Sequence, residues 1–121
     1  MKRILVIEDN QNIRENLAEL LLLNGYEALT AANGKEGIET ALVTQPDLLL
    51  CDISMPVMDG YTVLHTLKKD ERIANIPLIF LTARADKNEL SYGITEGARV
   101  YLVKPFTEDQ LMQAINSGLG S

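Results

Sequence analysis

The chain has 121 residues, of which 46% are hydrophobic, enough for one ordinary hydrophobic core and too few for two. The 17 acidic residues, against 11 basic ones, give a formal net charge of −6, which disfavours direct binding of nucleic acid. The single cysteine, Cys51, excludes an internal disulfide and favours a reducing compartment, in which it serves as a small core residue.

The first half of the chain alternates short apolar runs with segments of helical spacing. The apolar run 4–7 predicts a first strand, and apolar residues at 13, 17, 20 and 21 recur as on one face of a helix. Asn24-Gly25 is a helix-stop signal, and the weaker run 26–31 after it predicts an edge strand. Residues 38 and 42 repeat the helical spacing, and the run 48–51 predicts a third strand.

The second half continues this alternation. Apolar residues at helical spacing, 64 with 67, 90 with 94 and 111 with 115, predict three more helices, and the runs 78–81 and 100–103 between them predict two more strands. The four stronger runs, 4–7, 48–51, 78–81 and 100–103, predict strands buried on both faces. Strict alternation of strand and helix with short connections predicts an α/β fold with a parallel sheet covered by helices on both faces.

No repeat, low-complexity stretch or internal linker divides the chain, so we expect one domain over residues 1–117. Residues 118–121 are expected to be a tail, a linker or a cloning remnant, and the abrupt ending suggests truncation from a longer protein. The opening MKRILVIEDN has only four consecutive apolar residues, too few for a signal peptide or a membrane span. We therefore expect no membrane contact and a cytoplasmic location.

Polar residues stand where the predicted strands end. Glu8 and Asp9 follow the first strand, Asp52 the third, Thr82 the fourth and Lys104 the fifth. Ligands of open α/β sheets bind beyond the carboxyl ends of the strands, so we expect these side chains along one rim. Three neighbouring carboxylates repel one another without a counter-ion, and oxygen ligands suit a hard divalent cation such as Mg²⁺. Because Mg²⁺ keeps open positions for phosphate oxygens, the rim also suggests phosphoryl chemistry.

Four of the five rim residues also have a simpler structural explanation. Asp9 or the following Asn10 can cap the first helix, and Asp52 can cap a turn. Thr82 can form a turn through its hydroxyl, and Lys104 can be a solvated lysine. These explanations leave unexplained why three acids, a hydroxyl and an ammonium meet at the same end of four strands, and this coincidence favours a common site.

Four segments in register resemble the receiver domain of two-component response regulators: VIEDN at 6–10, CDISMPVMDG at 51–60, LTA at 81–83 and EGARVYLVKPF at 96–106. The resemblance covers practically the whole chain and implies a flavodoxin-like fold, with five parallel strands in the order 2-1-3-4-5 and five helices on both faces. It implies Mg²⁺ as cofactor and, as partners, a sensor histidine kinase or phosphotransfer protein and an unidentified output domain or partner protein. A phosphorylation-dependent homodimer stays open.

Three rim residues match positions that handle the phosphoryl group in this family. The resemblance implies that Asp52 takes the group from a phosphohistidine. It also implies that Lys104 neutralises Asp52 and then binds a phosphoryl oxygen, while Thr82 binds another. Pro105 matches the family's cis-proline, and Tyr101 matches an aromatic residue that moves together with the threonine hydroxyl. The resemblance thus implies a signalling switch that gains and loses a phosphoryl group, and not an enzyme that turns over a substrate.

The other rim residues match the magnesium ligands of the family. The resemblance implies that Asp9 and Asp52 bind Mg²⁺ through their carboxylates and that the main-chain carbonyl of Ser54 adds another oxygen. Glu8 is expected to act mainly through a bound water.

Three other functions start from the same residues. A magnesium-dependent phosphohydrolase with an aspartate nucleophile usually has a second acid two residues further on, where this chain has Ser54. A flavin-binding protein of this fold needs a first loop rich in Ser, Thr and Gly, whereas this loop reads EDNQN. An interaction module that is never phosphorylated would not need Asp52, Thr82 and Lys104 together.

Overall fold

The computed structural model of the chain describes residues 1–83 and 97–120. Five parallel strands form one sheet: β1 (Arg3–Ile7), β2 (Glu27–Ala31), β3 (Leu48–Asp52), β4 (Leu78–Thr82) and β5 (Val100–Val103). The described part also contains the helices α1 (Gln11–Leu23), α2 (Gly34–Thr44), α3 (Gly60–Lys69) and α5 (Glu108–Gly118). The helix expected around residues 90 and 94 lies outside the described residues.

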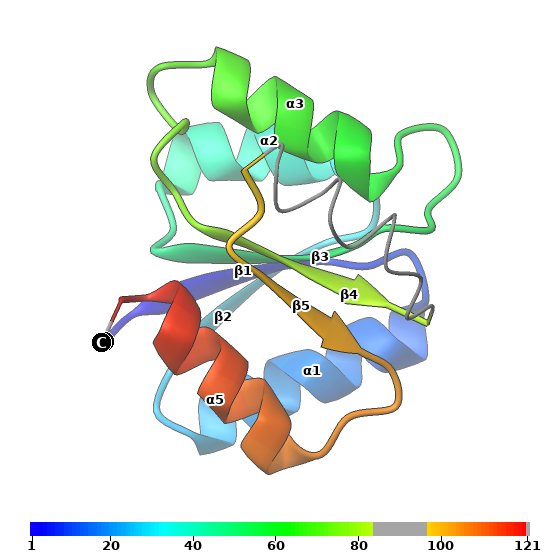
Figure 1. Cartoon of the computed structure of the whole chain (residues 1–121), viewed down its shortest axis with the longest axis vertical. Coiled ribbons are helices and arrows are strands. Elements are labelled where there is room, and N and C mark those ends of the chain that lie inside the picture. Colours follow the sequence, from blue (N-terminus) through cyan, green and yellow to red (C-terminus); the bar gives the residue numbers. More distant parts are fainter. Residues whose placement is uncertain (84–96, 121) are drawn as a thin grey trace.

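The sheet is the middle of three layers (Figure 1). Its strands follow the order β2-β1-β3-β4-β5, with α2 and α3 on one face and α1 and α5 on the other. The predicted α/β class, the parallel sheet and the strand order are therefore confirmed. The order places the carboxyl end of β1 beside that of β3, because Ile7 pairs with Cys51 across the two strands.

Burial separates the inner strands from the edges. Every residue of β3 and β4 is buried, as the apolar runs predict for strands covered on both faces. The same prediction is wrong for β5, where Val103 is 38% exposed, because β5 is the last strand of the sheet and pairs with β4 alone. The weaker run that predicts an edge strand forms β2, at the other end of the sheet.

The last helix continues into the stretch expected to be a tail. α5 ends at Gly118, which is buried, and a Cβ atom there would lie 2.8 Å from the Leu48 side chain and 3.0 Å from that of Ile79. A side chain at residue 118 would therefore press on the sheet, so this glycine lets α5 lie close to β3 and β4.

The start of α3 rests directly on the end of β3. Asp59 caps the helix by accepting a hydrogen bond from the Thr62 main chain, and the Gly60 N–H donates to the carbonyl of Ile53 (2.9 Å). A Cβ atom at Gly60 would lie 2.8 Å from the Asp52 carbonyl oxygen and 2.7 Å from the Ile53 Cα. Both are main-chain atoms that cannot rotate away, so Gly60 sets where Asp52 sits relative to α3.

We expect Gly60→Ala to lower the free energy of unfolding by about 2–3 kcal/mol, because the added methyl group forces α3 away from β3. Gly25→Ala is the matched control, since Gly25 has a φ of 86° and no atom within 4 Å of an added Cβ atom. Its effect comes from the backbone alone and should be about 1 kcal/mol. Urea denaturation compares the two variants, and equal losses would contradict the close packing at Gly60.

Candidate functional site

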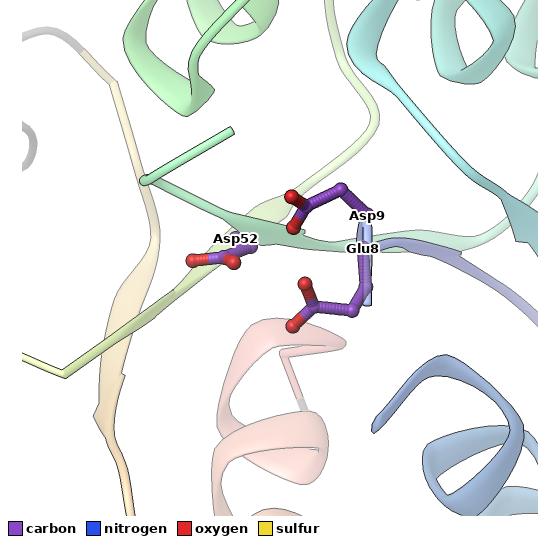
Figure 2. A group of neighbouring side chains, drawn as sticks. All are labelled: Glu8, Asp9 and Asp52. Carbon is purple, nitrogen blue, oxygen red and sulfur yellow. The ribbon is translucent and has the colours of Figure 1, made fainter. Parts of the chain in front are cut away.

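Three acids meet at the carboxyl ends of β1 and β3. Glu8 and Asp9 directly follow β1, and Asp52 is the last residue of β3. Figure 2 shows the three side chains next to one another, and one oxygen from each lies within 4.8 Å of the others. Glu8 and Asp52 are only 1% and 6% exposed, whereas Asp9 is exposed. The structure thus brings together the three acids that the strand ends predicted.

Glu8 is held through every polar group it has. Its main-chain N–H donates to Ala31 of β2 (3.1 Å), and its carbonyl accepts from Nη1 of Arg14 (2.8 Å). One carboxylate oxygen accepts from Nζ of Lys104 (3.0 Å) and the other from the main-chain N–H of Asn10 (3.2 Å). A buried carboxylate is tolerated only when it is paired and hydrogen-bonded in this way.

Lys104 has two acidic neighbours, and Glu8 is the nearer one. Its Nζ lies 3.0 Å from Glu8 Oε1 and 3.5 Å from Asp52 Oδ2, and the Lys104 side chain is 22% exposed. Its main-chain N–H donates to the Thr82 carbonyl (2.7 Å), and the Lys104–Pro105 peptide bond is cis, as predicted. Lys104 is therefore not merely a solvated lysine. Its ammonium lies closer to the buried Glu8 carboxylate than to that of Asp52.

The Asp52 carboxylate accepts a hydrogen bond from the main chain that follows it. Its Oδ1 accepts a hydrogen bond from the Ser54 main-chain N–H (3.2 Å), while Oδ2 faces Lys104. Asp52 therefore caps a turn, as its simpler structural explanation predicts. The same side chain also belongs to the acid cluster. The bond orients the Asp52 carboxylate at the end of the buried strand.

Asp9 is not the helix cap. Asn10 takes that role, because its side chain accepts a hydrogen bond from the Ile13 main chain (3.0 Å). Partial desolvation raises the pKa of Asp9 above its ordinary value, and the neighbouring Glu8 adds to this, while Lys104 acts in the opposite direction. The charge on Asp9 is therefore unfavourable in the metal-free site.

Thr82 lies at the same rim, one strand further along. It is buried, ends β4, and follows Leu81, which pairs with Asp52 across the sheet. Tyr101 lies in β5 opposite Phe80, is half-buried, and its ring centroid is 5.4 Å from that of Phe80. The two residues share the face covered by α2 and α3, and their coupled movement stays a prediction.

The donor set fits a hard divalent cation. Asp9 and Asp52 present carboxylate oxygens at one spot, and the single ammonium of Lys104 faces three negative charges. Oxygen-only ligands with excess negative charge are the set that Mg²⁺ prefers in proteins. The cluster can therefore hold a metal ion.

Sequence reasoning missed Arg14. Arg14 donates from Nη1 to the carbonyls of Glu8 (2.8 Å) and Asp9 (3.4 Å). A signal was present: Arg14 lies four residues after the cap Asn10, one helical turn into α1, from where a long side chain reaches back over the helix start.

The fold and the acid cluster define the class of protein: a flavodoxin-like α/β domain with three clustered acids at the carboxyl ends of its strands. Residues 4–116 match the family model of the response regulator receiver domain, so the chain belongs to that family. It is a receiver domain of two-component signalling, and therefore a switch rather than a classic enzyme.

Similar proteins agree with this assignment. Protein PilH of Pseudomonas aeruginosa is 35% identical over 98% of both chains. The chemotaxis protein CheY4 of Vibrio cholerae has 29% identity and a TM-score of 0.93 over 98% of both chains. The receiver domain of sensor histidine kinase PA1611 of P. aeruginosa, solved with magnesium coordinated in its active-site cleft, has 29% identity and a TM-score of 0.90, covering 99% of this chain and 98% of its own.

Other relatives are longer than this chain. It spans about half the length of several transcriptional regulators that are 36–40% identical to it. In the described ranges 1–83 and 97–120, no helix combines the length and the apolar character needed to cross a membrane.

Removing the lysine exposes the repulsion among the acids. We expect Lys104→Met to lower the free energy of unfolding in metal-free buffer by about 2–3 kcal/mol, because Glu8 then stays buried without its cation. Adding Glu8→Gln should recover part of that loss, which urea denaturation of the single and double variants measures. Losses that simply add in the double variant would show that the two side chains do not stabilise each other.

The raised pKa of Asp9 makes stability depend on pH in a defined direction. The folded protein holds this proton more tightly than the unfolded chain, so stability falls as the pH rises through the raised value. We expect Asp9→Asn to stabilise the metal-free protein at pH 7 by at most about 1 kcal/mol, since Asp9 is exposed to solvent. The gain should disappear at pH 3, where Asp9 is protonated in both states.

The control for this prediction is Glu19→Gln, which removes the same charge from an exposed position of α1. Thermal unfolding with EDTA and with MgCl₂ gives the comparison. Mg²⁺ should stabilise the wild type and Glu19→Gln but not Asp9→Asn. Stabilisation of Asp9→Asn equal to that of the wild type would remove Asp9 from the metal site.

Proposed function

We propose that Asp52 accepts a phosphoryl group from a phosphohistidine of a sensor histidine kinase or phosphotransfer protein, with Mg²⁺ bound beside it. One observation carries this proposal: carboxylates from the ends of two neighbouring strands lie within 4.8 Å, and the Lys104 ammonium reaches Glu8 and Asp52. Asp52 is the acid held directly at the end of a buried strand, where its position is best defined.

The contacts of the three acids support different roles for them at the metal. Asp9 and Asp52 would bind Mg²⁺ directly, together with the main-chain carbonyl of Ser54. Both carboxylate oxygens of Glu8 already accept hydrogen bonds, from Lys104 and the Asn10 main chain, which favours a role through a bound water. When bound, Mg²⁺ offsets negative charge on the phosphoryl oxygens.

In the transfer step, a carboxylate oxygen of Asp52 forms a bond to phosphorus while the bond from phosphorus to the donor imidazole nitrogen breaks. The imidazole nitrogen keeps the electron pair of the broken bond. The transition state is loose, so alignment and charge neutralisation are the main requirements and a weak nucleophile suffices. Lys104, 3.5 Å from Asp52 in the unphosphorylated site, would move to a phosphoryl oxygen, and the Thr82 hydroxyl would donate to another.

We also propose the biological setting. The kinase or phosphotransfer protein delivers the group, and an output domain or partner protein reads the phosphorylated surface. Matching transcriptional regulators are about twice as long as this chain, which leaves room for such a domain in them. The acidic net charge argues against direct binding of nucleic acid by this chain, and the lone reduced thiol suits the cytoplasm.

The test is incubation with Mg²⁺ and a small acyl phosphate or phosphoramidate, followed by intact-mass and peptide analysis. We expect one phosphoryl group on the wild type and none on Asp52→Asn. The control is Asp59→Asn, which keeps the cap of α3 because asparagine caps helices as well as aspartate. It should be labelled like the wild type, whereas labelling of Asp52→Asn at another acid would overturn the assignment.

A further inference from the structure

The guanidinium of Arg14 touches the main chain of both acids that follow β1. Arg14 is half-buried in the first turns of α1, and its main-chain N–H donates to the Asn10 carbonyl (2.9 Å). Its Nη1 donates to the Glu8 carbonyl at 2.8 Å and to the Asp9 carbonyl at 3.4 Å. One nitrogen thus bridges the main-chain carbonyls of Glu8 and Asp9, whose side chains are two of the three drawn in Figure 2.

The two acids depend on this bridge to different degrees. Glu8 is also fixed by Ala31 of β2 and by Lys104, so it should keep its place without Arg14. Asp9 is exposed, and the Arg14 bond ties its main chain to α1. Loss of the guanidinium would therefore loosen Asp9 first and change the distance between its carboxylate and that of Asp52.

We propose that Arg14 is a positioning residue for the divalent cation, which makes the site prefer Mg²⁺ to Ca²⁺ by holding the turn at Glu8 and Asp9. This inference rests on the proposed magnesium site. Mg²⁺ needs near-ideal octahedral geometry at short ligand distances, whereas Ca²⁺ accepts longer and less regular arrangements. A loosened Asp9 should therefore weaken Mg²⁺ binding more than Ca²⁺ binding.

Charge and geometry predict different outcomes when Arg14 is removed. Taking a positive charge away from an acidic site would strengthen binding of both divalent cations by similar factors. Taking away the bridge weakens binding, and it does so selectively for Mg²⁺. The ratio of the two affinities therefore isolates the positioning effect from the charge effect.

The test compares Arg14→Gln and Arg14→Lys with Arg3→Gln. Arg3 is the matched control, because its Nη1 also donates to a main-chain carbonyl, that of Thr44 (2.7 Å), at the opposite end of β1. Five steps along the extended chain separate it from Glu8 by roughly 16 Å, beyond the reach of screened charge. Arg14→Lys keeps the charge but lacks the fixed fork of the guanidinium.

Isothermal titration calorimetry with MgCl₂ and with CaCl₂ gives the affinities. For Arg14→Gln we expect about a tenfold loss of Mg²⁺ affinity, the size seen when residues behind a metal ligand are removed. Ca²⁺ affinity should change by less than about threefold, because its coordination adapts. Arg14→Lys should show a smaller fall in the ratio of Mg²⁺ affinity to Ca²⁺ affinity, and Arg3→Gln should match the wild type.

Amide hydrogen exchange in metal-free protein supplies a readout that needs no cation. The Asn10 amide, which donates to Glu8 Oε2, should exchange faster in Arg14→Gln and not in Arg3→Gln. Wild-type Mg²⁺ to Ca²⁺ ratios in the folded Arg14 variants would overturn the inference, and Arg14→Lys decides alone if Arg14→Gln does not fold. A wild type that binds no Mg²⁺ would overturn the proposed metal site as well.

Discussion

The ion pair between Lys104 and Glu8 is the interaction on which the rim depends. Glu8 is 1% exposed, so its charge needs a partner inside the protein, and Lys104 supplies it at 3.0 Å. The pair connects the segment after β5 to the segment after β1, across the ends of β3 and β4. Because the lysine is used in this way, Asp9 and Asp52 retain negative charge that a divalent cation can balance.

The layout of the sheet could be predicted because burial and periodicity are local properties of the chain. Branched apolar runs identify the strands, and parallel strands bring their carboxyl ends to one rim, which is enough to group Glu8, Asp9 and Asp52. The burial of β5 could not be predicted in this way, since the run 100–103 reads like an inner strand. Its edge position follows from the strand order, which came from the family resemblance.

The contacts within the site could not be predicted because they depend on side-chain distances. Sequence reasoning paired Lys104 with Asp52, whereas the ammonium lies closer to Glu8. It left the choice of helix cap open between Asp9 and Asn10, and the side chain of Asn10 makes the cap. The contact of Gly60 with the end of β3 appears only when the helices are placed on the sheet.

We propose above that the acids beyond β1 and β3 form one cation site beside the lysine. A crystal structure with Mn²⁺, which accepts the same oxygen ligands as Mg²⁺ and scatters anomalously, tests it most directly. We expect one strong anomalous peak, from an ion bound by the Asp9 and Asp52 carboxylates and the Ser54 carbonyl, with Lys104 still on Glu8. A peak elsewhere, or none at saturating Mn²⁺, would contradict it.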